Sequence, residues 1–237
     1  MTNRNLSRTL ILSLAAIYFI SQFYRASLGT LTSNIEQDFF LNPEELGRLG
    51  AVFFLAFAFT QVPLGIILDY YNPLKVIVFM LLIIYLGTIV IAFSGSYFSL
   101  VFGRSLQGIG CGVCLMGPLV FLSKQIPENK FSKISGYVMG LGGLGALVAT
   151  QPFYFLTLEF GWKKSYYITT FFIIFLIICI SCFLLKEIKL KKENKKNVNL
   201  HEYFLIILSK NFLYMLPMSF FGYASFAFLL TLWGGEY

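Results

Sequence analysis

The segment LKVIVFMLLIIYLGTIVIAF, residues 74–93, is almost wholly apolar and carries a single charged side chain, Lys75, near its start. About 20 residues of this kind in one α-helix span the hydrocarbon core of a bilayer. Six further runs of similar length and character occur along the chain. Together they predict seven membrane-spanning helices, at residues 9–32, 46–68, 74–93, 97–123, 134–156, 165–185 and 212–233.

The whole chain has the composition of a membrane protein. Of its 237 residues, 57% are hydrophobic and only 12% are charged, and its mean hydropathy is +0.76. A soluble domain carries about 25% charged residues, which cover its water-exposed surface. The first run follows Arg4 and Arg8, is longer than a signal-peptide core and lacks a small-residue cleavage pattern, so it is predicted to be a retained span. We therefore expect an all-α, multi-pass integral membrane protein whose constant partner is the lipid bilayer.

The distribution of positive charge predicts which side of the membrane each connection occupies. The net charge is +7, and most of the excess lies in a short run at residues 186–196. With the N-terminus in the cytoplasm, 13 lysines and arginines fall on the cytoplasmic side and only 3 on the outer side, in agreement with the positive-inside rule. A basic run beside an apolar segment suits anionic lipid head groups, so no nucleic-acid partner is expected. The cytoplasmic set is Arg4, Arg8, Lys75, Lys124, Lys130, Lys133, Lys186, Lys189, Lys191, Lys192, Lys195, Lys196 and Lys210, and the outer set is Arg48, Lys163 and Lys164.

The spacing of the spans predicts three parts. Residues 1–185 hold a bundle of six closely connected helices, and residues 186–210 form a basic cytoplasmic linker. Residues 211–237 contain a seventh helix that would begin a second bundle. A single helix after a six-helix block is incomplete by itself, so we interpret the chain as a portion of a larger bundle whose missing C-terminal half would be a further partner.

Two arginines inside predicted spans are the main candidates for function. Arg25 lies eight residues before Ser33, and Arg104 lies seven residues after Tyr97, so both are expected about 11–12 Å below the outer surface. A charge within the membrane costs about 2.5–3.5 kcal/mol on insertion scales, and no Asp or Glu lies in the middle of the predicted spans. Two interpretations are open: contact with an anionic solute, or a structural role through snorkelling or through hydrogen bonds between helices.

Polar residues accompany each arginine on one face of its helix. Tyr18, Gln22 and Arg25 follow i, i+4, i+7 spacing in the first span, and Arg104 and Gln107 lie three residues apart in the fourth. A polar stripe on an apolar helix is expected to face protein or water rather than lipid. These five residues are therefore the predicted solute-binding residues.

Glycines predict close packing between helices. Gly108-x-x-x-Gly112 and Gly136-x-x-x-Gly140 have the spacing of helix–helix contact motifs in membranes. The fifth span is rich in glycine and carries Pro152 near its end. The helix-breaking chemistry of proline predicts a bend there, with a role in gating as one interpretation.

Nothing in the sequence has the pattern of a catalytic or metal site. Cys111-x-x-Cys114 and Cys179-x-x-Cys182 have the spacing of zinc ligands, but both lie in apolar runs without a nearby histidine or acid, where cysteine is a common small packing residue. His201 is the only histidine and falls in the predicted linker. The sequence has no nucleophile–base pair, paired carboxylates or phosphate-binding glycine loop. We therefore predict no catalytic residue, no metal and no cofactor, and do not expect an enzyme.

Several motifs together resemble the major facilitator superfamily. The segment Gly65-Ile66-Ile67-Leu68-Asp69, with Asn72 and Lys75 after it, resembles the family's loop between its second and third helices. The fourth span contains a second resemblance, Arg104-x-x-Gln107-Gly108-x-Gly110-x-Gly112. Two shorter segments are similar to the family in the same settings, Gly161-Trp162-Lys163 and Leu232-Trp233-Gly234-Gly235.

The resemblance implies a fold of twelve helices in two six-helix halves, of which this chain would supply seven helices. It implies a transporter in the cell membrane that moves a small solute by alternating access, through a cavity lined largely by the first, fourth, seventh and tenth helices. Arg25 and Arg104 lie on two of these helices and favour a solute with a carboxylate or another anionic group, such as an organic acid, an amino acid or a short peptide. The alternative is a truncated membrane protein that does not transport and has a scaffold or regulatory role.

The resemblance also assigns Gly65, Asp69 and Lys75 to a cytoplasmic gate, where Asp69 would pair with basic groups. Tyr70 and Leu74 occupy positions that are basic in the family's loop motif. A weaker charge pairing is therefore expected at this gate than in the family at large.

Overall fold

The computed structural model describes residues 8–188, together with Pro217 and Phe221. The chain divides into two compact units, Met1–Asn194 and Lys195–Tyr237, and every helix with described bounds belongs to the first unit. His201, the predicted linker beyond residue 188 and, apart from those two residues, the predicted seventh span lie outside the described residues.

All the secondary-structure elements with described bounds are α-helices. In chain order they are α1 (Arg8–Phe39), α2 (Pro43–Tyr70), α3 (Pro73–Ala92), α4 (Tyr97–Cys111), α5 (Val113–Gln125), α6 (Glu128–Val148), α7 (Gln151–Phe160) and α8 (Trp162–Ile188). Within the described residues, 6 segments are long and apolar enough to cross a membrane, with α4 and α5 together forming one of them, Tyr97–Gln125. These segments correspond to the first six predicted spans, so the all-α membrane fold is confirmed for this part of the chain.

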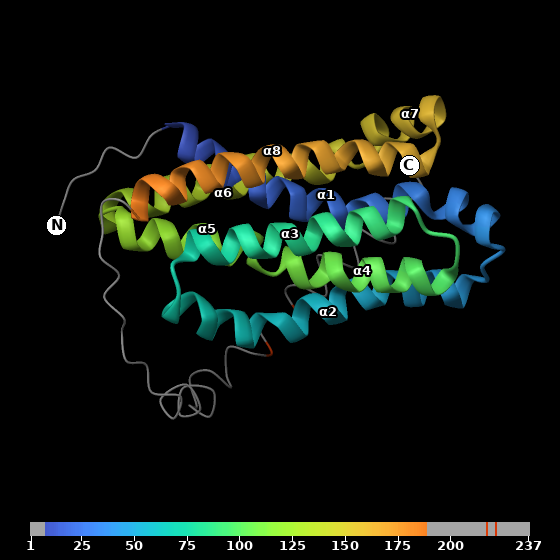
Figure 1. The fold of residues 1–237 in the computed structure, drawn as a ribbon, viewed down its shortest axis with the longest axis horizontal. Helices are drawn as coiled ribbons and strands as arrows, with labels where there is room; N and C mark the ends of the chain where they lie inside the picture. The colour runs from blue at the N-terminus through green and yellow to red at the C-terminus, as the bar shows by residue number, and fades with distance from the viewer. Residues whose placement is uncertain (1–7, 189–216, 218–220, 222–237) are drawn as a thin grey trace. The chain divides into compact units, whose positions relative to one another are not determined.

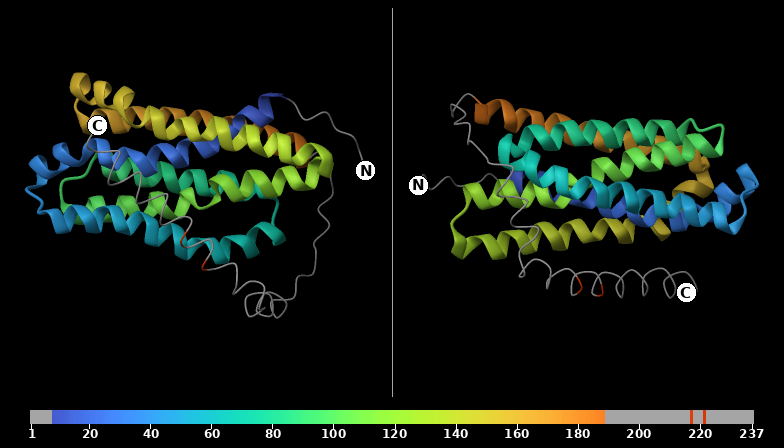
Figure 2. Two further views of the ribbon diagram at one scale, coloured as in Figure 1. Left: turned by 180° about the vertical axis from the view of Figure 1, so that it is seen from behind. Right: turned by 90° about the horizontal axis from the view of Figure 1, so that it is seen from below.

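The spans lie side by side, and their connections gather at two opposite ends of the bundle (Figures 1 and 2). The α1–α2, α3–α4 and α7–α8 connections lie at one end, and the α2–α3 and α5–α6 connections lie at the other (Figure 1). At the first end the Trp162 indole N–H donates to the Asp38 carboxylate at 2.7 Å. At the second end the Lys124 ammonium donates to the Leu68 carbonyl at 3.2 Å. The alternation is that of a chain which crosses a membrane back and forth.

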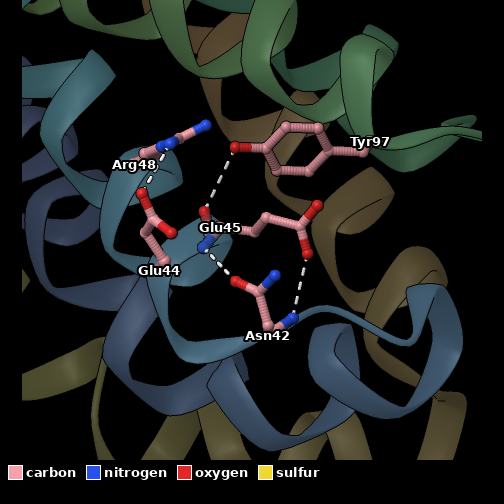
Figure 3. Close-up of polar contacts among 5 residues, drawn as sticks. All are labelled: Asn42, Glu44, Glu45, Arg48 and Tyr97. Carbon is pink, nitrogen blue, oxygen red and sulfur yellow. Dashed lines mark hydrogen bonds and ion pairs between the residues drawn. The ribbon is translucent and has the colours of Figure 1, made fainter.

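Side-chain caps fix the start of α2 (Figure 3). The Asn42 side chain accepts a hydrogen bond from the Glu45 backbone N–H at 2.9 Å, and the Glu45 carboxylate accepts one from the Asn42 N–H at 2.9 Å. Arg48 pairs with Glu44 at 2.5 Å, and the hydroxyl of Tyr97 donates to the Glu45 carbonyl at 3.2 Å. A helix N-cap contributes about 1 kcal/mol, and the Tyr97 bond holds the starts of α2 and α4 together.

Helix α1 is longer than the predicted first span, which was expected to end at residue 32. The helix continues to Phe39 because its added turns are amphipathic: Ile35 is buried, whereas Glu36 and Gln37 are exposed. The chain then reverses through Phe40, whose φ of 52° lies in the left-handed region that non-glycine residues seldom adopt. The helix can outlast the predicted span because a run of apolar residues marks the part of a helix within the membrane and not the end of the helix.

Two predicted spans contain an interruption. Gly112 separates α4 from α5 but keeps helical angles, φ −54° and ψ −36°, so the chain continues in one direction. A true break separates α6 from α7 at Thr150, where ψ is −117°, two residues before Pro152. Proline has no N–H to continue the helical ladder and is favoured at helix starts, so the predicted bend is confirmed. The Thr30 hydroxyl of α1 donates to the Ala149 carbonyl at this break, at 2.5 Å.

Glycines of α6 let this helix approach α1 closely. They are not the glycines of the motif that the sequence indicated. A Cβ added at Gly145 would collide with a backbone carbonyl of α1, and one added at Gly142 would collide with the ring of Tyr18. A Cβ at Gly136 or Gly140 would meet nothing within 4 Å. The predicted contact through Gly136 and Gly140 is therefore wrong among the described helices, because the face that α6 turns to α1 lies on a different arc of the helix.

This difference between two faces of α6 can be tested by adding one methyl group to each. We expect Gly145→Ala to lower the thermal unfolding midpoint in detergent, because overpacking against a backbone atom typically costs about 1–3 kcal/mol. Gly140→Ala is the matched control and should leave the midpoint unchanged or raise it, since alanine is favoured over glycine within a helix by about 0.5–1 kcal/mol. Equal midpoints for the two variants would contradict the assigned packing face.

Candidate functional site

Helix α1 carries three of the predicted solute-binding residues and packs against α6 and α8, with smaller contacts to α2 and α4. The Tyr18 side chain is buried, and its ring lies against Gly142 of α6. One turn further on, the Gln22 amide N–H donates to the Tyr18 hydroxyl at 2.6 Å. The two residues are thus joined on one face of α1, as the spacing of the polar stripe predicted.

Arg25 lies one turn beyond Gln22 and is half-buried. Its guanidinium carbon Cζ is 4.3 Å from the centroid of the Phe57 ring on α2. A cation over an aromatic face is attracted by the negative face of the ring, by about 0.5–1 kcal/mol at an exposed site and about 2 kcal/mol when desolvated. The side chain of Arg25 therefore reaches across the bundle to a neighbouring helix, which is not the geometry of an arginine that snorkels along its own helix to the interface.

Arg104 of α4 is more deeply enclosed, with 2% of its surface exposed. Its Cζ lies 4.6 Å from the ring centroid of Phe53 on α2. Its Nη1 donates to the backbone carbonyl of Tyr24 at 2.9 Å and to the Gln107 side-chain oxygen at 3.2 Å. Its Nε and Nη2 are buried without a hydrogen-bond partner among the described residues, and no described carboxylate forms an ion pair with it.

The two arginines are brought together by α2. Phe53 and Phe57 are four residues apart, which is one helical turn or about 6 Å along the axis. The two guanidinium groups therefore lie against the same face of α2, about one helical turn apart. The sequence had suggested a single depth for both. Arg104 also bonds to the residue directly before Arg25, so α1, α2 and α4 are joined at this point.

Gln107 is wholly buried, and its side chain forms hydrogen bonds inside the bundle. Its amide N–H donates to the Thr88 hydroxyl of α3 at 3.0 Å, and that hydroxyl in turn donates to the Ile84 carbonyl at 2.8 Å. Gln107 thus links Arg104 to α3. The structure brings Arg104 and Gln107 together as predicted, but it gives both of them bonds to protein groups.

The same network continues into α8. The Tyr24 hydroxyl lies 2.7 Å from the Thr169 hydroxyl, and the Ser27 hydroxyl lies 3.1 Å from that of Tyr166. The backbone of Tyr24 accepts from Arg104, so one residue of α1 is held from two sides. In a bilayer, where no water competes for such groups, these bonds fix the rotation of α1 and hence the direction of Arg25.

Sequence reasoning missed four residues of this site: Phe53, Phe57, Tyr24 and Thr88. The spacing of the two phenylalanines is visible in the sequence, but the chain has 27 phenylalanines, so the spacing alone does not single them out. Tyr24 takes part through its backbone carbonyl, for which the sequence carries no sign.

The predicted gate residues lie at the other end of α2, about 18 Å along the helix axis from Phe57. Asp69 is exposed in the last turn of α2, Lys75 is in the first turn of α3, and Gly65 has open space beside its Cα. The Asn72 side chain caps α3 by accepting from the Leu74 N–H at 2.9 Å. The structure therefore keeps these residues apart from the arginines.

Lys124 is a further residue at this end that sequence reasoning did not assign to the gate. Its ammonium group donates to the carbonyl of Leu68, directly before Asp69. A cation at the C-terminal end of a helix is favoured by the helix dipole. Lys124 thus brings a positive charge to the last turn of α2, where Tyr70 occupies a position that is basic in the family motif.

The four cysteines do not come together as a metal site. Cys111 and Cys114 are buried, Cys179 is partly exposed and Cys182 is exposed. Among the described residues, no group of three or more histidine, cysteine, aspartate or glutamate side chains could hold a metal ion.

The chain belongs to the Major Facilitator Superfamily, whose family model matches residues 14–237. The predicted resemblance to this family is thereby confirmed. The proteins of this family are integral membrane transporters rather than enzymes.

Curated relatives match part of their length to this chain. An uncharacterized transporter of Buchnera aphidicola subsp. Acyrthosiphon pisum is 32% identical over 146 residues, which cover 60% of this chain and 36% of the relative. The probable sulfoacetate transporter SauU of Cupriavidus necator is 24% identical over 167 residues, which cover 70% of this chain and 39% of the relative. The niacin transporter NiaP of Acinetobacter baylyi is 28% identical over 141 residues, which cover 60% of this chain and 32% of the relative. The matched segments thus span between 32% and 39% of the length of these relatives.

Among solved structures, the fold is similar to that of the peptide transporter POT in complex with sulfate, with a TM-score of 0.62 and 12% sequence identity. The likeness covers 96% of this chain and 47% of that one. At such low identity it concerns the fold alone, and it agrees with the helix arrangement of the family.

The buried network that supports Arg104 predicts a cost for removing one hydroxyl. Thr88→Val leaves the Gln107 amide without its acceptor and should destabilise the bundle by about 0.6–1.7 kcal/mol, the range of interhelical hydrogen bonds in membranes. Thr60→Val is the matched control, because the Thr60 hydroxyl donates only within its own helix, to the Ala56 carbonyl at 2.7 Å. Thermal unfolding in detergent measures both, and a smaller loss for Thr88→Val than for Thr60→Val would argue against the network.

Proposed function

We propose that the chain is part of a transporter that moves a small anionic solute across the cell membrane by alternating access. The observation that carries the proposal is the position of Arg25, which is half-buried and held against Phe57 inside a major-facilitator bundle. Of the two intramembrane arginines, Arg25 is the less buried, so we assign it the direct contact with the anion.

The cost of an intramembrane charge supports this assignment. An arginine inside a membrane span is disfavoured by about 2.5–3.5 kcal/mol and is a functional candidate by default. An anionic solute would offset that cost when it binds. The planar guanidinium offers several N–H groups in a fork that matches a carboxylate or sulfonate, and the Gln22 amide and Tyr18 hydroxyl lie on the same face of α1 to contact neutral parts of the solute.

Arg104 and Gln107 take a different role in this proposal. Both are buried, and their bonds run to Tyr24 and Thr88, so we assign them to holding α1 in place rather than to touching the solute. Their effect on binding would be indirect, through the position of Arg25.

The names of two relatives support an acidic solute. Sulfoacetate carries a sulfonate and a carboxylate, and niacin carries a carboxylate on a pyridine ring; these compounds are named for the relatives from Cupriavidus necator and Acinetobacter baylyi. The class that we propose for this chain is therefore a small carboxylate or other anion, with organic acids, amino acids and short peptides as members.

The proposal extends to the organisation of the whole transporter. Residues 1–185 would form the first six-helix half, residues 186–210 the cytoplasmic linker, and residues 211–237 the first helix of a second half. The charge distribution supports a cytoplasmic N-terminus, and with that orientation Gly65, Asp69 and Lys75 would lie at a cytoplasmic gate. Lys124 would supply positive charge to that gate in place of the absent basic residue at Tyr70.

Binding of matched charged and neutral compounds to the full-length protein tests the proposal. Nicotinate and sulfoacetate should raise the unfolding midpoint, because a ligand that binds only the folded state stabilises it by mass action, whereas uncharged nicotinamide should have little effect. Arg25→Gln should weaken anion binding by about tenfold or more, since hydrogen bonds to charged groups are typically worth about 1.5–3 kcal/mol. The anion affinity of Arg25→Lys should lie between those of the wild type and of Arg25→Gln, because lysine keeps the positive charge but lacks the forked N–H groups of the guanidinium.

Arg48→Gln is the control for this experiment, because Arg48 is an exposed arginine paired with Glu44 at the start of α2. Its anion affinity and its uptake into proteoliposomes should equal those of the wild type. Unchanged anion affinity in Arg25→Gln would contradict the assigned role of Arg25.

A further inference from the structure

We propose that Cys111 and Cys114 are a redox-active dithiol, which a small neutral peroxide oxidises to a disulfide across the junction of α4 and α5. Neither a metal site nor the proposed solute contacts account for this Cys-x-x-Cys pair. Both cysteines are free, and only 1% and 0% of their surfaces are exposed. The modification is independent of the proposed function, because it needs no solute.

The pair bridges the point at which one helix ends and the next begins. Cys111 is the last residue of α4, and Cys114 is the second residue of α5. Gly112, between them, donates its N–H to the Ile109 carbonyl at 3.2 Å, three residues back instead of four. Helical geometry separates Cα atoms three residues apart by about 5 Å, within the range of about 4.4–6.8 Å found for disulfides. The two thiols are already close enough to interact.

The junction joins a tightly packed segment to a more weakly held turn. A Cβ added at Gly110 would collide with the Met80 carbonyl of α3, so Cys111, the next residue, is carried on a fixed part of α4. The Gly112 carbonyl accepts only a long hydrogen bond, 3.4 Å, from the Gln61 amide of α2. The turn can therefore open while α4 stays packed on α3, and a molecule as small as hydrogen peroxide can reach the Cys111 thiol.

The surroundings give the two thiols different roles. Arg25 and Arg104 both lie close enough to act on the charge of Cys111, and a neighbouring cation favours the thiolate, which is the form of cysteine that attacks. Cys114 instead donates its thiol hydrogen to the Gly110 carbonyl at 3.9 Å. We therefore assign Cys111 as the attacking cysteine and Cys114 as the resolving one. The same two positive charges disfavour a metal cation between the sulfur atoms.

The oxidation proceeds in two steps. The Cys111 thiolate attacks one oxygen of hydrogen peroxide and the O–O bond breaks. The hydroxide that leaves takes up the proton lost by the thiol and becomes water, while Cys111 becomes a sulfenic acid. The Cys114 sulfur then attacks the Cys111 sulfur, and its proton leaves with the sulfenic hydroxyl as a second water. Two thiols thus lose two hydrogens, and the new bond closes the Gly112 turn.

Disulfide mapping by mass spectrometry on the full-length protein tests the proposal. The protein is treated with hydrogen peroxide in detergent, the remaining thiols are blocked under denaturing conditions, and the mass of the peptide that carries Cys111 and Cys114 is measured. Cys179-x-x-Cys182 is the matched internal control, because it has the same spacing within the uninterrupted α8 and its cysteines are more exposed. We expect the buried pair to lose two hydrogens first, and dithiothreitol to restore them.

Two single variants separate the steps of the reaction. Dimedone, a reagent that combines with sulfenic acids, should label Cys111 in Cys114→Ala, because the resolving thiol is absent. In Cys111→Ala the label on Cys114 should be several-fold lower. Hydrogen exchange reports on the turn itself: the backbone amides of residues 109–115 should exchange several-fold more slowly in the oxidised wild type than in the reduced wild type.

Each part of the proposal can be overturned separately. If Cys111 and Cys114 stay reduced in excess peroxide, or oxidise only after Cys179 and Cys182, the dithiol is not redox-active. This mapping uses the wild type, so a variant that fails to fold does not affect it. Equal dimedone labelling of the two variants would overturn the assigned roles of the cysteines, and unchanged hydrogen exchange after disulfide formation would overturn the closing of the turn.

Discussion

The described helix bundle is organised around two positive charges that the membrane disfavours. Arg25 and Arg104 each replace a lipid or water environment with the face of a phenylalanine on α2, at 4.3 and 4.6 Å from the ring centroids. The attraction of a ring for a cation, up to about 2 kcal/mol, is smaller than the insertion cost of about 2.5–3.5 kcal/mol per arginine. The remainder has to come from hydrogen bonds, and Arg104 obtains them from Tyr24 and Gln107. Arg25 is the less buried of the two, and in the proposed function an anionic solute would add hydrogen bonds to it.

The position of Arg25 depends on the rotation of α1, and several contacts fix that rotation. Gly142 and Gly145 let α6 come close to one side of α1, and the Tyr24 hydroxyl contacts Thr169 of α8 on another side. Arg104 holds the backbone of Tyr24 from α4. A helix held on three sides is a rigid element, and these contacts thereby fix the direction of the Arg25 side chain that it carries.

The parts of the fold that follow from local chemistry are visible in the sequence, and those that depend on which faces meet are not. The apolar runs predict the described spans because span length is set by bilayer thickness, and Pro152 predicts the break between α6 and α7. The continuation of α1 to Phe39 does not follow from hydropathy, because it depends on burial of Ile35 above the apolar run. Glycine spacing predicts that α6 packs closely but favours Gly136 and Gly140, which lie on another arc. Arg25 stands out as an isolated charge in an apolar run, whereas Phe57 is one of many phenylalanines until its ring is seen beside the guanidinium.

A crystal structure of the full-length protein with 5-bromonicotinate would test the central claim most directly, since the anomalous scattering of bromine locates the bound anion without ambiguity. The account predicts one strong bromine peak inside the bundle, with the carboxylate of the ligand within hydrogen-bonding distance, about 2.7–2.9 Å, of the Arg25 guanidinium while that group remains on the face of Phe57. A bromine peak elsewhere in the bundle, with Arg25 bonded to protein groups on all of its N–H donors, would contradict it.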